Sequence, residues 1–193
     1  MVRGEIMKYQ LCFLFCFIIT SCTNNNIVGT DNKQSNTSID TVQLINTIKK
    51  EYLEINSKAA VYHKVEKNVF GQSAEGGVII AYYDHKDFKK ANTTFYGETG
   101  KVSTEYYFNK YGLFFAYSIK YLYDKPIYIK GSKIASIQEN RYYLLKNQLI
   151  KWLDNNKKSV NPNSKEYQDE NKYLLEDLNV IKQTLGAYKT NGK

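Results

Sequence analysis

Apolar residues recur at intervals of three and four between residues 41 and 56, and this spacing predicts an amphipathic helix. The repeating positions are Val42, Ile45, Ile48, Tyr52 and Ile55. The opposite face is charged and carries Lys49, Lys50 and Glu54. We expect the helix to begin near Ser38 or Asp40, either of which can cap it, and to pack its apolar stripe on a sheet.

From about residue 59 the apolar period changes to two, which is typical of strands with one covered face. In the segment 101–109, for example, apolar and aromatic side chains alternate with more polar ones. Strands are predicted over residues 60–69, 78–83, 93–96, 101–109 and 113–123. Short polar or glycine-containing segments separate them, which indicates hairpin connections.

A weak internal repeat lies in this part of the chain. Residues 105–108 line up with residues 141–144 at an offset of 36, and the pair 113–114 lines up with 149–150. Each copy has a strand, a tight turn and a return strand, with Gly112 in the first turn and Asn147 in the second. Both residue types tolerate positive φ. Two copies are too few for a solenoid, so we expect two related hairpins in one antiparallel sheet.

Residues 164–186 carry the pattern of a second amphipathic helix. Its apolar stripe comprises Tyr167, Leu174, Leu178, Ile181 and Leu185. Asn163 and Glu166 have the spacing of a capping box, and Gly186 is a stop signal. These elements predict one α+β domain over residues 39–189, with an antiparallel meander of six or seven strands covered on one face by both helices.

The front of the chain has a different character. An unbroken apolar run over residues 11–19 follows Lys8, as in a secretory signal, and it is shorter than the roughly 20 residues that span a bilayer. The run ends in Ile19-Thr20-Ser21-Cys22, which resembles a lipobox, the motif at whose cysteine bacteria attach lipid. This resemblance implies a signal peptide over residues 1–21 and a lipid anchor on Cys22. The alternatives are an ordinary signal peptide with a chance cysteine, or a short buried strand.

The segment 22–38 is the lipidated cysteine followed by a flexible tether on this interpretation, because it is polar and without apolar period. Farther along, residues 78–153 resemble small, functionally uncharacterised bacterial envelope lipoproteins built from strand-turn-strand units. The motifs that carry the resemblance are Tyr82-Tyr83-Asp84, Tyr96-Gly97-Glu98-Thr99-Gly100-Lys101, Tyr106-Tyr107-Phe108 and Leu113-Phe114-Phe115. It implies a location in the cell envelope, facing the periplasm or the exterior, and assigns no activity.

The predicted export of the protein determines how its charge and its cysteines are interpreted. The chain has a formal net charge of +8, but an exported protein does not meet nucleic acid. The expected partners are the membrane, through the lipid anchor, and another envelope protein or an anionic glycan. Cys12 and Cys16 lie in the predicted signal and Cys22 is acylated, so the folded domain would hold no thiol, no disulfide and no thiolate metal site.

The 18 tyrosines suggest a binding surface, because exposed rings beside cations can bind a glycan or a partner protein. The predicted binding face comprises Tyr107, Tyr117, Tyr121, Tyr123, Tyr143, Lys120 and Arg141. The competing interpretation places these rings in the core with their hydroxyls at the rim. We expect a non-catalytic binding or assembly module, and inhibition of another enzyme through a protruding loop at residues 97–100 is a further option.

The sequence gives weaker evidence for catalysis than for a binding surface. Glu98, Glu105 and Glu139 could converge as a carboxylate site, which makes a hydrolase acting on envelope glycan or lipid the alternative function. His63 is expected on the covered face of its strand, and His85 lies in a polar turn without a second ligand cluster. The sequence therefore predicts no catalytic residue, no metal site and no cofactor.

The anchor can be tested directly. We expect Cys22→Ser to release the protein from bacterial membranes into the soluble fraction, because the thioether to the lipid can no longer form. Fractionation followed by immunoblotting measures the change. If the Cys22→Ser protein stays in the membrane fraction as fully as the unaltered chain, the lipid anchor is wrong.

Overall fold

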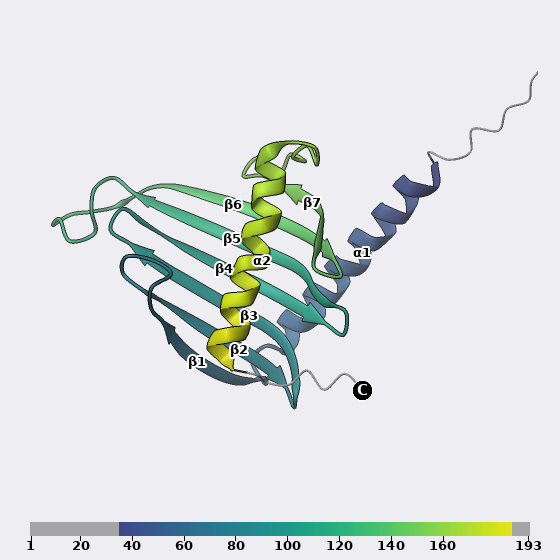
Figure 1. The fold of residues 1–193 in the computed structure, drawn as a ribbon, viewed down its shortest axis with the longest axis horizontal. Coiled ribbons are helices and arrows are strands. Elements are labelled where there is room, and N and C mark those ends of the chain that lie inside the picture. Colours follow the sequence, from purple (N-terminus) through teal and green to yellow (C-terminus); the bar gives the residue numbers. More distant parts are fainter. Residues whose placement is uncertain (1–34, 187–193) are drawn as a thin grey trace, which may run out of the picture.

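A computed structural model describes residues 35–186 of the chain, with side chains from residue 41 onward. The predicted signal peptide, Cys22 and the first part of the predicted tether lie outside the described residues. Residues 35–38, the end of the predicted tether, are helical, so the first helix begins at Ser35 and not near Ser38 or Asp40. The described residues form one seven-stranded antiparallel sheet and two helices, which confirms the predicted α+β fold. Figure 1 shows how the helices lie against the sheet. The elements are α1 (Ser35–Lys58), β1 (His63–Val69), β2 (Gly77–Asp84), β3 (Asp87–Gly97), β4 (Gly100–Asn109), β5 (Gly112–Tyr123), β6 (Ile134–Leu145), β7 (Gln148–Leu153) and α2 (Lys165–Leu185).

The sheet is a simple meander in which each strand pairs with the next along the chain. The 36-residue repeat corresponds to the hairpins β4–β5 and β6–β7. Each has a β-bulge at the equivalent place, after Tyr107 in β4 and after Tyr143 in β6. The two turns also touch, since the side chain of Asn147 accepts a hydrogen bond from the backbone N–H of Leu113 at 2.7 Å.

Gly112 makes this contact between the turns possible. Its φ is +114°, and a Cβ at this position would lie 2.5 Å from Oδ1 of Asn147. Any larger residue would therefore displace the side chain of Asn147 and its hydrogen bond to Leu113. The repeat thus produces two hairpins that are locked together at their turns.

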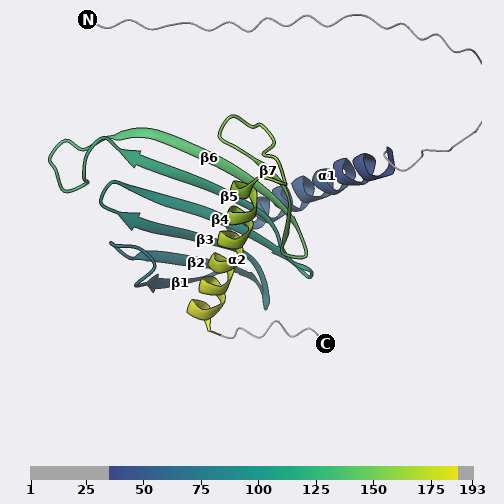
Figure 2. The ribbon, with the colours of Figure 1, turned by 45° about the horizontal axis from the view of Figure 1, so that its top comes forward.

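The helices cover opposite faces of the sheet, contrary to the expectation that both cover one face (Figures 1 and 2). One core joins α2 to residues such as Tyr106 and Tyr142, and the other joins α1 to Tyr107 and Tyr143. Neighbouring residues of a strand point to opposite faces, so a pair of buried aromatic residues needs cover on both sides. The single-face expectation missed this because the central strands are apolar on both faces.

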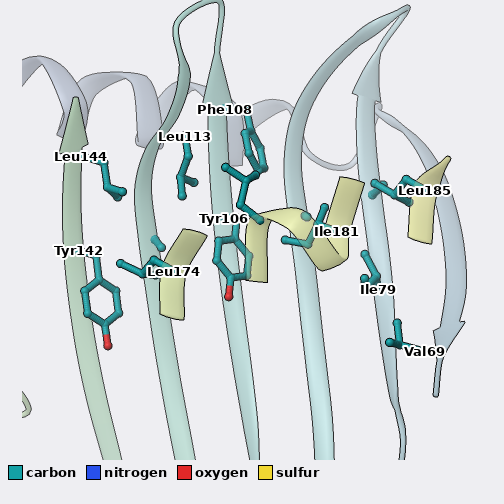
Figure 3. Packing of buried hydrophobic residues seen from close by; sticks show 14 of the residues in the cluster. Val69, Ile79, Tyr106, Phe108, Leu113, Tyr142, Leu144, Leu174, Ile181 and Leu185 are labelled. Atoms are coloured by element: carbon teal, nitrogen blue, oxygen red, sulfur yellow. The ribbon is translucent and has the colours of Figure 1, made fainter. Parts of the chain in front are cut away.

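The core beneath α2 forms from the apolar stripe that the sequence predicted for this helix. Figure 3 shows Leu174, Ile181 and Leu185 of α2 lying over side chains of the sheet, among them Tyr106 and Leu113. The helix is capped by Ser164, whose hydroxyl accepts from the N–H of Tyr167, and not by Asn163 as expected. Neither helix of the described residues is long and apolar enough to cross a membrane.

Two acidic residues of α2 face the sheet and bind tyrosine hydroxyls there. Tyr106 donates to Asp177 and Tyr142 donates to Glu170, each at 2.5 Å. Burial raises the pKa of Asp177 above its usual range, although the hydrogen bond from Tyr106 acts in the opposite direction. As the pH rises, Asp177 therefore keeps its proton to a higher pH in the folded chain than in the unfolded chain.

This raised pKa makes a prediction about stability. Stability from Asp177 is fully present below its usual pKa of about 4 and is lost as the pH rises through the higher folded value. We expect Asp177→Asn, which keeps an acceptor for Tyr106, to remove this loss, so that the variant gains stability relative to the wild type towards neutral pH. Urea unfolding across the acidic to neutral range measures it. Asp169→Asn, at an exposed position of α2, is the control and should not change the pH dependence in this way.

Candidate functional site

The structure divides the predicted binding face into buried, cavity-lining and distant residues. Tyr107 and Tyr143 are 0 and 5 % exposed and belong to the core under α1, so neither ring is exposed as the binding face requires. Tyr117 and Arg141 are partly exposed neighbours, paired across β5 and β6. Tyr143 still contributes to the wall of a cavity beside them.

The other predicted residues lie away from that cavity. Tyr121 is on the same face, farther along β5, with the ammonium of Lys101 4.9 Å from its ring centre. Tyr123 follows a β-bulge at the end of β5. Lys120 is exposed on the opposite face, because it alternates with its neighbours along the strand.

The candidate site is the cavity where α1 crosses β5 and β6. It has a volume of about 270 Å³ and a wall that is mainly aromatic. The lining residues are Ile48, Lys49, Tyr52, Phe115, Tyr117, Arg141 and Tyr143. Its volume lies near the lower end of ligand sites, which suits one small molecule or one unit of a larger one.

Arg141 is the most informative side chain of this wall. One guanidinium nitrogen donates to Glu139 at 2.8 Å, and the guanidinium carbon lies 4.9 Å from the ring centre of Tyr117. The other terminal nitrogen, Nη1, is buried and has no hydrogen-bond partner among the described residues. A buried donor without a partner is costly, and a ligand oxygen would satisfy it.

The electrostatics of the cavity are set by this arginine. Its hydrogen bond is the main cause that lowers the pKa of Glu139, and Tyr117 acts in the same direction. The pKa of Tyr117 is raised, first by burial and then by its hydrogen bond to Glu139. Tyr117 is therefore a neutral donor at physiological pH, and the cavity presents cations and aromatic rings to a ligand.

A buried polar cluster positions α1 next to the cavity. Lys90 is 5 % exposed, and its ammonium lies 2.8 Å from Glu105 and 3.1 Å from the side-chain oxygen of Asn56 on α1. Tyr107 donates to Glu105 at 2.5 Å and accepts from Asn56 at 3.0 Å. The pKa of Tyr107 is raised strongly, first by burial and then by Glu105. This cluster joins α1 to β3 and β4.

A second hollow, of about 410 Å³, lies beside the C-terminal half of α1 and the turns of the sheet. Four of its seven charged side chains pair with one another: Glu54 with Lys58 at 2.7 Å and Asp87 with Lys89 at 3.2 Å. Because these charges satisfy each other, this hollow offers less to a charged ligand than the cavity around Arg141.

The three carboxylates of the hydrolase alternative do not come together. Glu98 is exposed in the turn between β3 and β4, Glu105 is paired with Lys90, and Glu139 is paired with Arg141. Glu105 and Glu139 lie two strands and two register positions apart, which corresponds to roughly 12 Å between Cα atoms at normal strand spacing. An acid catalyst also needs a raised pKa, whereas the pKa of Glu139 is lowered.

The histidines occupy exposed positions. His63 is exposed, which corrects the expectation that it lies on a covered face, and His85 pairs with Asp84 at 2.9 Å in the turn between β2 and β3. Within residues 41–186, no group of three or more metal-ligating side chains is close enough to hold a metal ion.

The sequence did not single out Tyr52, Lys49 and Phe115 as site residues. Tyr52 was placed in the apolar stripe of the first helix, and its size and position in that stripe were the available signal. The ring of Tyr52 packs edge-on against Tyr107 and Phe115, at 4.9 and 5.2 Å between centres. Its place in the cavity depends on the face that α1 covers, which the pattern left open.

The buried cluster predicts a stability effect. We expect Glu105→Gln to lower the free energy of unfolding by about 2–3 kcal/mol, since it leaves the ammonium of Lys90 buried without its counter-charge. Glu105→Leu combined with Lys90→Met should cost less than the single change, because no charge is then stranded. Urea unfolding followed by Trp152 fluorescence measures both.

The ion pair between Asp87 and Lys89, nearer the surface on the same strand as Lys90, provides the control for these variants. Asp87→Asn should change stability by less than about 1 kcal/mol, since surface ion pairs contribute little. If the double variant of Lys90 and Glu105 is less stable than Glu105→Gln, the loss of stability does not come from the stranded charge of Lys90.

No protein-family model, curated protein or solved structure matches this chain.

Proposed function

We propose that this protein is a membrane-anchored, non-catalytic binding module of the bacterial cell envelope, and that the cavity beside Arg141 takes an anionic glycan unit. The observation that carries the proposal is Arg141, which lines a cavity rich in aromatic rings and whose buried Nη1 has no partner among the described residues. The anchor rests on the lipobox resemblance at Cys22.

The chemistry of the wall fits a sugar that carries a carboxylate or phosphate. Aromatic rings such as Tyr52 and Tyr117 offer flat apolar surfaces to the C–H faces of a sugar ring. Guanidinium groups bind carboxylate and phosphate oxygens through parallel hydrogen bonds, and Lys49 adds a second positive charge. The cavity volume admits one such unit, so a longer glycan would place one residue in it and the remainder outside.

Non-catalytic binding accounts for the cavity with fewer requirements than hydrolysis. Glu139, the acidic residue next to the cavity, is held ionised by Arg141, which suits the positioning of Arg141 and does not suit proton donation. The buried hydrogen bonds of Tyr107 and Lys90 keep α1 in place and so keep the cavity open without a ligand.

The proposal predicts preference for a charged sugar. We expect glucuronate to bind more tightly than glucose, and Arg141→Gln to weaken glucuronate binding by about tenfold or more, as expected for a lost hydrogen bond to a charged group. Titration calorimetry measures both affinities.

Lys165→Gln is the matched control, because Lys165 is exposed at the start of α2 and its replacement changes the net charge equally. It should leave binding unchanged. Equal affinity for glucose and glucuronate, or equal loss in both variants, would contradict a site at Arg141. Thermal unfolding of each variant shows that the fold is retained.

A further inference from the structure

The connection between β5 and β6, residues 124–133, exposes three consecutive apolar side chains. Ile127, Tyr128 and Ile129 are 53, 68 and 43 % exposed. This loop extends beyond the neighbouring turns at the end of the sheet (Figures 1 and 2). Isolated exposed apolar residues are common on protein surfaces, whereas three in sequence at the tip of a protruding loop form a small apolar surface.

Hydrogen bonds hold this loop in shape, so the exposure is a property of the folded chain. The N–H of Ile129 donates to Pro126 at 2.9 Å, and the N–H of Ser132 donates to Ile129 at 3.0 Å. At the base, the N–H of Asp124 donates to Lys133 at 3.0 Å. The N–H of Ile127 donates to the carbonyl of Glu98 at 2.8 Å, which attaches the loop to the turn between β3 and β4.

Positive charge surrounds the apolar tip. The loop contains Lys125, Lys130 and Lys133 and one acidic residue, Asp124, so its net charge is +2. The adjacent turn contributes one acidic side chain, Glu98. None of the three loop lysines forms an ion pair among the described side chains.

Other exposed apolar side chains lie at the same end of the sheet. In a meander, the β1–β2, β3–β4 and β5–β6 connections share one end. Phe70 in the first connection is 81 % exposed, Tyr96 at the end of β3 is 42 % exposed, and Ile134 at the start of β6 is 51 % exposed. The carbonyl of Tyr96 accepts from the N–H of Glu75, which joins the first two connections.

We propose that the loop 124–133 inserts Ile127, Tyr128 and Ile129 into the interface of an anionic phospholipid bilayer. Apolar and aromatic side chains enter the boundary between headgroups and acyl chains, and flanking lysines keep their ammonium groups at the anionic headgroups. The tip is convex and basic, so it complements a broad anionic surface. It is a membrane contact separate from the Cys22 anchor and from the cavity at Arg141.

The tip is small, so its binding is weak and reversible. Each lysine near an anionic surface strengthens attachment roughly fivefold, and this contribution falls with added salt. A contact of this strength orients a protein that is already held at a membrane. This contact would bring the end of the sheet that carries the β5–β6 loop to the lipid surface.

A local probe separates the tip from any other attachment of the chain. We expect the full chain carrying Tyr128→Trp, reconstituted in vesicles of phosphatidylcholine and phosphatidylglycerol, to show blue-shifted emission that brominated acyl chains quench. Vesicles of phosphatidylcholine alone should give much weaker quenching. Trp152 is present in every variant, so the unaltered chain supplies the background.

Tyr111→Trp is the matched control, because Tyr111 is 59 % exposed in the β4–β5 turn at the opposite end of the sheet and lies beside Lys110. Its emission should not respond to brominated lipid. Adding Lys130→Gln and Lys133→Gln to the tip variant should lower the ratio of inserted to free tip by roughly tenfold or more.

Two results would overturn the proposal. One is equal quenching at positions 128 and 111, or no quenching at either, in the presence of phosphatidylglycerol. The other is a tip emission that shifts with protein concentration in the absence of lipid, which would identify the surface as a contact between copies of this chain. Loss of the Cys22 anchor or of glycan binding would leave the quenching pattern interpretable, because each is measured separately.

Discussion

Burial of aromatic side chains on both faces of β4 and β6 is the constraint on which the rest of the structure depends. Tyr106 and Tyr107 are consecutive and fully buried, and Tyr142 and Tyr143 repeat this arrangement 36 residues later. Such pairs cannot be covered by one layer, because consecutive side chains of a strand point in opposite directions. A helix is therefore required on each face, and the three-layer architecture follows.

The same tyrosines also determine how the helices are placed. A buried hydroxyl needs a hydrogen-bond partner, and the partners come in part from the helices: Asp177 on α2 for Tyr106, and Asn56 on α1 for Tyr107. Apolar packing would tolerate small displacements of a helix, whereas these hydrogen bonds specify one position. The cavity beside Arg141 exists because α1 is held in that position across β5 and β6.

Much of the fold could be predicted from the sequence, because the relevant signals are local. The periods of 3.6 and 2 identified both helices and the meander, and the repeat identified the two related hairpins. The choice of face could not be predicted, since segments such as Leu113-Phe114-Phe115-Ala116 are apolar throughout and a bulge lets Phe114 and Phe115 both contact the α1 side. The cavity could not be predicted in full for the same reason. The sequence pointed to Tyr117 and Arg141, but Tyr52 joins them only through the tertiary position of α1.

The consequences of the positive charge depend on where each cation lies, and the net charge of +8 does not describe them. Lys90 is buried and neutralised by Glu105, so it contributes to the position of α1 and offers nothing to a partner. Arg141 is neutralised in part by Glu139, but its buried Nη1 has no partner among the described residues, which leaves capacity for one more acceptor. Lys130 and Lys133 of the β5–β6 loop are exposed and Lys125 is half-buried. None of the three forms an ion pair among the described side chains, so their effect is long-range and screened by salt. The same residue types thus provide a buried structural cation, a cavity-lining cation with one nitrogen still free of a partner among the described residues, and a diffuse basic surface, and only burial and pairing distinguish them.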